Sequence, residues 1–352
     1  MVDWLSPMQQ TYEYYIVDPR TWKDVKRLDN VVSSSINRDL TVETKGSASI
    51  VVNDSVGEDY VGIYLVTVQN GVRERHPLGV FLVQTPSSNY NGKYREITMD
   101  AYTPLIELKE DKPPVGYFIP KQENILERAY VLTKEHLRAP VVKTTNALPL
   151  FSNFIANEDD TWMSFLSDLV KNAKYTYGLD ERCRILFVPD QDTNALQPVW
   201  TYNDDNSSIL YDDITFDHDL FGIPNVVEVI YSSNGFTYTY TAQNTDPNSP
   251  TSIPRRGRVI LHREKNPSFG AEPTRSMIED YAEKTLRELS TVEYTIRYRH
   301  GYCPVRIGDC VRLNYKRAEL NGIKAKVISQ DISCTDGCPV DETAVFTRKL
   351  YG

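Results

Sequence analysis

The chain has 352 residues, a formal net charge of -9 and a sequence pI near 5.2. This acidity excludes a general nucleic-acid-binding protein, because clustered lysine and arginine side chains are what hold the phosphate backbone. Five cysteines in a chain of this length do not describe a disulfide framework, so we expect a reducing compartment. No segment approaches the roughly 18 to 20 apolar residues that span a bilayer, and we expect no membrane segment.

The N-terminal part of the sequence is predicted to be β-rich. Residues 11–83 consist mostly of short alternating runs separated by turn residues. Within them, Asn70-Gly71 is a strong signal for a two-residue hairpin. We therefore predict a first domain, residues 1–103, with barrel-like β structure.

The clearest change of period lies between residues 157 and 190. Asp160 or Thr161 can cap a helix. Apolar residues then recur at three- and four-residue spacing, which predicts one buried helical face: Trp162, Phe165, Leu166, Leu169, Val170 and Ala173. Alternating residues on either side of a turn at Gly178-Leu179-Asp180-Glu181 predict a β-hairpin directly after this helix. With a further amphipathic helix at 121–138, these elements define a central α/β domain, residues 104–213.

The C-terminal part returns to β structure from residue 214. Its strands are interrupted by one predicted helix, 275–290, and later strands are separated by Gly308-Asp309 and Asn321-Gly322 turns. This defines a third domain, residues 214–352, which is again barrel-like. The predicted fold class is α+β and mainly β, with two β-barrel-like domains flanking the central α/β segment.

Several segments of the chain, in their order, resemble the phage tail-hub family. They are the helix and hairpin that end in F-V-P-D (161–190), F-G-I-P-N-V-V-E-V-I (221–230), N-T-D-P-N-S-P-T-S followed by R-R-G-R (244–258), Y-A-E-K-T-L-R-E-L-S (281–290), P-V-R-I-G-D-C-V-R-L (304–313) and a final F-T-R-K-L-Y. Such proteins are the central baseplate hubs of contractile-tailed phages, the structural N-terminal part of siphophage tail-tip proteins, and hubs of related injection systems. The resemblance covers roughly residues 160–352.

The resemblance implies a structural virion protein of the tail tip or baseplate, assembled in the host bacterial cytoplasm. Two β-barrel-like domains per chain imply a homotrimer that presents six of them to a sixfold tail tube while it receives a threefold spike or fibre. The implied partners are the tail tube or distal tail protein, the spike or fibre protein and the tape measure protein. DNA would pass through the lumen without specific binding.

The sequence shows no known catalytic motif, and we expect a protein that is not an enzyme. Asp217-His218-Asp219 imitates an acid-base or metal cluster, but at strand spacing the two carboxylates lie on one face and His218 on the other. A solvated strand end is the favoured interpretation. The competing function is a carbohydrate-binding or cell-wall-degrading tail-tip module, which the tyrosine and tryptophan content favours.

Four cysteines lie within the last 50 residues, and four thiolates could hold zinc or an iron-sulfur cluster. They are Cys303, Cys310, Cys334 and Cys338. A regular hairpin with its turn at Asn321-Gly322 would place Cys310 about 20 Å from the other three, at roughly 3.3 Å per residue. We therefore expect no cofactor, and the metal site remains the alternative if residues 303–309 double back.

Overall fold

The computed structural model describes residues 2–54, 56–90, 92–93, 95–205, 208–233, 235–270 and 272–352. The chain forms two compact units. Unit 1 comprises Met1–Ile214 and Tyr298–Ala344, and unit 2 comprises Thr215–Arg297 and Val345–Gly352. Among the described residues, no helix has the length and apolar character needed to cross a bilayer.

The N-terminal region of unit 1 is a set of antiparallel strands. These are β1 (Gln9–Asp18), β2 (Lys23–Leu28), β3 (Val31–Asp39), β4 (Gly46–Val52), β5 (Tyr60–Gln69), β6 (Val72–Tyr90) and β7 (Arg95–Tyr102). Their order in the sheet is β3-β4-β7-β6-β5-β1-β2. The predicted Asn70-Gly71 hairpin is confirmed, because Gln69 pairs with Val72 and both turn residues have positive φ.

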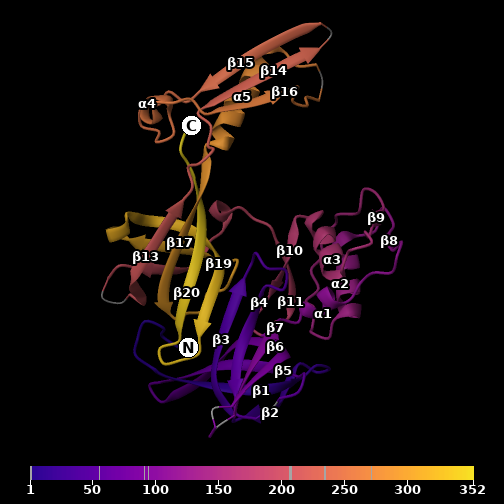
Figure 1. Ribbon diagram of the computed structural model, residues 1–352, viewed down its shortest axis with the longest axis vertical. Coiled ribbons are helices and arrows are strands. Elements are labelled where there is room, and N and C mark those ends of the chain that lie inside the picture. The colour runs from indigo at the N-terminus through magenta and orange to yellow at the C-terminus, as the bar shows by residue number, and fades with distance from the viewer. Residues whose placement is uncertain are drawn as a thin grey trace. The chain divides into compact units, whose positions relative to one another are not determined.

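The insert of unit 1 follows β7 (Figure 1). It contains α1 (Ile106–Glu110), β8 (Phe118–Ile119), α2 (Ile125–His136), β9 (Phe154–Ile155), α3 (Trp162–Lys171), β10 (Tyr175–Leu179) and β11 (Ile185–Pro189). The strand β12 (Pro198–Asn203) follows the insert and belongs to the large sheet. The predicted helix begins where the sequence indicated, because the Thr161 hydroxyl accepts a hydrogen bond from Ser164 N at 3.1 Å. Its apolar face is buried, and β10 and β11 form the predicted hairpin.

The C-terminal strands continue the same sheet. They are β13 (Leu210–His218), β17 (Thr291–Gly301), β18 (Cys310–Tyr315), β19 (Leu320–Ser333) and β20 (Pro339–Lys349), and β13, β17 and β20 contribute residues to both units. The order along the sheet is β13-β17-β20-β19-β3, so β19 joins the C-terminal strands to the N-terminal ones. This joint runs from Ser329 opposite Asp39 to Ser333 opposite Ser35.

One hairpin turn differs from the prediction. β18 and β19 pair antiparallel, but the chain reverses at residues 316–319, where Glu319 takes a left-handed conformation. The predicted turn residues Asn321 and Gly322 lie inside β19, and a register shift at Leu313/Asn314 accommodates them. Asn-Gly therefore marks an irregularity of the strand here, because positive φ at Gly322 is also compatible with a bulge.

Unit 2 contains a three-stranded sheet and one long helix (Figure 1). Its elements are β14 (Val226–Ser233), β15 (Phe236–Gln243), α4 (Ile253–Arg256), β16 (Leu261–Lys265) and α5 (Arg275–Leu289). The strand order is β15-β14-β16, and apolar residues of β14, β15 and α5 form the core between the sheet and the helix. The helix predicted at 275–290 is confirmed, with its Ile278, Ala282 and Leu286 buried.

The prediction of an α+β, mainly β chain is confirmed by these elements. The closure of either β region into a barrel and the division at residues 103 and 213 stay predictions. The two compact units are defined by contacts between residues, and each combines segments that are distant in the sequence. They therefore do not test a division of the chain at residues 103 and 213. The three longer helices, α2, α3 and α5, were predicted most closely, because each has an apolar face with a clear period. The short α1 and α4 were not predicted.

Candidate functional site

A buried polar cluster lies inside unit 1, and we call it the Glu342 network. Its members are Tyr202 of β12, Tyr298 and His300 of β17, Gln330 of β19 and Glu342 of β20, and each is at most 3% exposed. The Glu342 carboxylate accepts hydrogen bonds from Gln330 Nε2 at 2.6 Å and from the Tyr298 hydroxyl. The Tyr202 hydroxyl donates to it at 3.4 Å, and His300 Nε2 lies 3.4 Å away. One carboxylate thus links four strands.

The histidine of this network is held as an imidazolium. His300 Nδ1 donates to the carbonyl oxygen of Gly301 at 2.7 Å, while Nε2 faces Glu342. Burial disfavours the charged ring, but bonding to Cys303 and Glu342 outweighs it and raises the pKa of His300 to about 10. Burial likewise opposes ionisation of Glu342, yet the bonds from His300, Tyr298 and Gln330 keep the pKa of its carboxyl below the ordinary value.

The tyrosines of the network act as donors. Desolvation raises the pKa values of Tyr202 and Tyr298 well above the ordinary value, so both hydroxyls keep their protons. The Tyr202 hydroxyl also lies 3.3 Å from Cys303 Sγ. Because every member is shielded from water, the arrangement can hold a charge pair in place but offers no surface to a substrate. Its chemistry is that of a structural ion pair.

Alternation along two strands explains how these polar groups reach the interior. In β17, Tyr294, Ile296, Tyr298 and His300 occupy every second position and are all buried. In β20, Glu342 lies on the same buried face as Val340 and Ala344. Sequence reasoning missed this network. The available signal was a histidine and a glutamate on the apolar face of two alternating strands, since such positions rarely carry charge without a partner.

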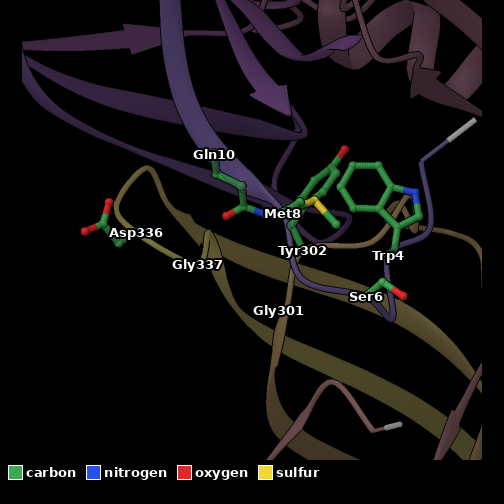
Figure 2. Close-up of a pocket in the computed structure, with 8 residues that line it drawn as sticks. All are labelled: Trp4, Ser6, Met8, Gln10, Gly301, Tyr302, Asp336 and Gly337. Atoms are coloured by element: carbon green, nitrogen blue, oxygen red, sulfur yellow. The ribbon is translucent and has the colours of Figure 1, made fainter. Parts of the chain in front are cut away.

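A small cavity opens on the surface of unit 1. Figure 2 shows the residues that line it: Trp4, Ser6, Met8, Gln10, Gly301, Tyr302, Asp336 and Gly337. Its volume is about 340 Å³, which suits one amino-acid side chain or a sugar ring. The Trp4 ring packs edge-on against Tyr302 and His76, with centroids 5.2 Å and 4.8 Å away. The indole is therefore fixed by packing, and the buried Gln10 Oε1 has no hydrogen-bond partner in the described part of the chain.

The structure distributes the four candidate metal-ligating cysteines over separate surroundings. Cys303 belongs beside the Glu342 network, 3.9 Å from His300 Nδ1. Cys310 lies opposite Lys326 in the β18–β19 pairing, and Lys326 is eight residues before Cys334 along the chain. Within the described ranges, no group of three or more histidine, cysteine or acidic residues is placed to hold a metal ion.

Cys334 and Cys338 are the two cysteines that lie together. Both are buried in the core that the N-terminal strands share with Ile332 and Val340. Desolvation raises the pKa of Cys334 to about 11 and that of Cys338 to about 12. Burial therefore keeps both thiols protonated at neutral pH. Two thiols in this core provide at most half of a four-cysteine site.

The remaining sequence candidates have ordinary structural partners. Asp217 pairs with Arg297, and the His218 ring stacks on Tyr294 with centroids 4.7 Å apart. In the R-R-G-R segment, residues 255–258, Arg256 is the last residue of α4 and donates to the carbonyl oxygens of Ile223 at 2.8 Å and Leu220 at 3.0 Å. These contacts hold unit 2 together locally.

Comparison with known proteins gave matches to solved structures. No protein-family profile and no curated protein sequence matches the chain. A tail protein from Neisseria meningitidis is 12% identical and aligns over 96% of each chain with a TM-score of 0.58. The 43 kDa tail protein of prophage MuSo2 from Shewanella oneidensis is 11% identical over 96% of this chain and 98% of its own, also with a TM-score of 0.58.

The chain has the fold of phage tail proteins. A component of the type VI secretion system of E. coli, described as structurally similar to T4 phage tail proteins, is 9% identical. It aligns over 92% of this chain and 75% of its own with a TM-score of 0.50. The resemblance noted in the sequence is thereby confirmed at the level of the fold, and it extends beyond residues 160–352 to almost the whole chain.

Proposed function

We propose that this protein is a structural hub of a phage tail, a baseplate or a related injection particle. The observation that carries the proposal is the fold match, because two phage tail proteins align over nearly their entire length and that of this chain. The proposed role is non-enzymatic.

In the proposed assembly, three copies form a homotrimer. Each chain carries a β-rich region at either end, β1–β7 and β17–β20, so three chains supply six such regions to a sixfold tail tube. Within one chain the two regions already join edge to edge through β3 and β19. A similar contact between chains would bring the N-terminal region of one copy against the C-terminal region of the next and cover further strand edges.

The proposed partners follow from this position. The tail tube or distal tail protein would contact one side of the ring, and the threefold spike or fibre would contact the other. The tape measure protein would end at the hub, and DNA would cross the lumen without specific binding, as the acidic composition favours. The protein would be a virion component, assembled in the cytoplasm of the host bacterium.

The copy number in the assembled tail tests this proposal. Cryo-electron microscopy of purified tails should show three copies around the tail axis. Light scattering on the concentrated free protein should approach three times the chain mass of 40.3 kDa. A single copy or a twofold pair at the tail tip would overturn the trimeric adaptor.

The second candidate function is a carbohydrate-binding or cell-wall-degrading module, and the Trp4 cavity is the observation that favours it. Aromatic rings beside amide and carboxylate groups are typical of sugar-binding sites, and Trp4, Gln10 and Asp336 provide these groups. However, Trp4 already packs against the rings of His76 and Tyr302, and Tyr302 is buried. Release of reducing sugar or muropeptides by the purified protein, lost on substitution of one carboxylate, would favour this function over the hub.

We further propose that the hub carries no metal. The separate positions of Cys303 and Cys310 support this. Protein purified without chelator and without oxygen should contain less than one zinc or iron atom per chain by elemental analysis. Stoichiometric metal, or a brown absorbance near 400 nm that Cys334→Ser abolishes, would contradict it.

A further inference from the structure

The small sheet of unit 2 has one uncharged edge. β15 pairs with β14 alone among the described strands, and its sequence F-T-Y-T-Y-T-A-Q contains no charge, proline or glycine. Exposed edges in natural sheets usually carry such residues, which prevent pairing with other chains. The opposite edge of the same sheet does carry them, because β16 includes His262, Arg263 and Lys265. The edge of β15 therefore lacks the usual protection.

The backbone of β15 directs alternate hydrogen-bonding groups to this open edge. Three residues of β14 form backbone hydrogen bonds on the side of β16, away from β15. The carbonyl oxygen of Ile230 accepts from Asn266 N at 2.8 Å, and Ser232 N donates to the Asn266 side chain at 2.7 Å. Val226 N donates to the carbonyl oxygen of Ile260 at 3.2 Å. Their partners in β15 are Thr239, Thr237 and Gln243. In an antiparallel pair, residues opposite such positions point their own N–H and C=O groups away from the shared ladder.

The helix beside this edge is acidic. On the face of β15 that packs on α5, the Tyr238 hydroxyl donates to Glu279 at 2.5 Å and the Tyr240 hydroxyl donates to Glu283 at 3.3 Å. Neither carboxylate has an ion-pair partner in the described part of the chain. Arg275 lies over the rings of Phe236 and Tyr238 at the start of the strand.

We propose that the edge of β15 binds an extended segment of another protein, which adds a fourth strand to this sheet. Main-chain hydrogen bonds to Thr237, Thr239 and Thr241 would provide the affinity, as in other cases of strand addition. Alternate side chains of the segment lie on the α5 face, next to Glu279 and Glu283. The complementary residues there are lysine or arginine. This surface is additional to the proposed hub contacts of the β regions.

A second copy of this chain fits the edge less well. Antiparallel pairing of two β15 strands about Thr239 would place Tyr238 opposite Tyr240 of the copy, with both α5 helices on one face. Glu279 of each chain would then lie near Glu283 of the other, with one Arg275 for every two carboxylates, so the joint surface keeps an excess of negative charge that disfavours this pairing. The occupant is therefore a basic segment of a different protein.

Synthetic peptides and one backbone substitution test the proposal. The probes are Thr-Lys-Thr-Lys-Thr-Lys-Thr and the same peptide with glutamate in place of lysine, titrated into the full-length protein by calorimetry and amide NMR. We expect the lysine peptide to bind and to shift the amide signals of Thr237, Thr239 and Thr241. Thr239→Pro removes an N–H that faces the open edge and leaves the β14–β15 ladder intact, so it should weaken binding at least tenfold. Thr239→Val, which keeps the N–H, is the matched control.

The acidic residues receive their own control. The double variant Glu279→Gln, Glu283→Gln keeps hydrogen-bond acceptors for Tyr238 and Tyr240. It should lower the affinity for the lysine peptide several-fold and abolish the preference for this peptide over the glutamate peptide. Glu288→Gln, on the same helix but paired with Lys284 at 3.7 Å, should change neither. Equal binding by both peptides, binding unchanged by Thr239→Pro, or no binding at millimolar peptide would overturn the proposal. Self-association that Thr239→Pro abolishes would assign the edge to a second copy instead. None of these outcomes bears on the copy number in the tail, which tests the hub separately.

Discussion

The two units use the same chemical pair, a tyrosine hydroxyl and a glutamate carboxylate, in opposite surroundings. In unit 1, Tyr298 donates to Glu342 in the interior, where both are nearly inaccessible to water. In unit 2, Tyr240 donates to Glu283 at the surface of α5. When one partner of a buried hydrogen bond to a carboxylate is removed, water cannot take its place, whereas water can hydrate a carboxylate at the surface. The first pair therefore stabilises the fold, and the second remains available to a partner.

The largest expected effect comes from removing the buried charge. Glu342→Gln leaves the His300 imidazolium without its counter-ion. We expect the free energy of unfolding to fall by about 3 to 5 kcal/mol, as when a buried ion pair loses one partner. Urea denaturation followed by circular dichroism measures this loss.

The neighbouring residue provides the control. Asp341 lies one position away on β20, and its exposed carboxylate is 3.5 Å from Arg299 Nε. Asp341→Asn should change stability by less than about 0.5 kcal/mol, as expected for a surface ion pair. Equal losses in the two variants would mean that burial does not distinguish these carboxylates.

A smaller effect is expected from the buried tyrosine. Tyr298→Phe removes one donor to Glu342 and keeps the ring, so the carboxylate loses one of its hydrogen bonds without a large cavity. We expect a loss of about 1 to 3 kcal/mol, the cost of leaving a buried polar group without a partner. A melt that matches the wild type would show that the remaining donors, Gln330 and Tyr202, fully compensate.

The pH dependence of the network follows from its two ionised groups. His300 has a raised pKa in the folded state, so its contribution is complete below the unfolded pKa, near 6.5, and is lost as pH rises through about 10. Glu342 has a lowered pKa, so its contribution is present above about 4.5 and is lost as pH falls below it.

The stability difference between the wild type and Glu342→Gln should therefore be largest between pH 4.5 and 6.5. It should shrink at higher pH by at most about 1.4 kcal/mol per unit, the limit for one proton. Denaturant unfolding in a series of buffers checks this. A difference that grows from pH 7 to 9 would contradict an imidazolium at His300.

Local structure was largely predictable from the sequence, and long-range pairing was not. The α3 helix and the β10–β11 hairpin follow from period and capping at Thr161, all within thirty residues. The β3–β19 joint depends on a register between segments almost three hundred residues apart, and no local pattern specifies it. The Glu342 network has the same origin, because Tyr202 and Glu342 meet only after β12, β17, β19 and β20 are arranged.

The cysteines show the same limit. Their spacing suggested a metal site. The predicted β18–β19 hairpin placed Cys310 away from Cys334, as the structure does, although the turn was misplaced by a few residues. What spacing could not predict is that Cys303 lies beside His300 while Cys334 and Cys338 enter a separate core. That outcome depends on the path of residues 301–309 after β17.

The smallest effect on stability is expected for the exposed tyrosine–glutamate pair of unit 2. Tyr240→Phe removes the hydroxyl that donates to Glu283 on α5 and leaves its ring against the sheet. Water can hydrate the freed carboxylate, so we expect an unfolding curve indistinguishable from that of the wild type. The same variant should strengthen binding of the lysine peptide at the β15 edge, because a Glu283 that no longer accepts from Tyr240 is free to reorient toward a lysine. Tyr298→Phe is measured in the same experiment. An equal loss of stability in both variants would show that the exposed Tyr240–Glu283 pair stabilises the fold as much as the buried Tyr298–Glu342 pair, and that exposure to water does not distinguish the two pairs.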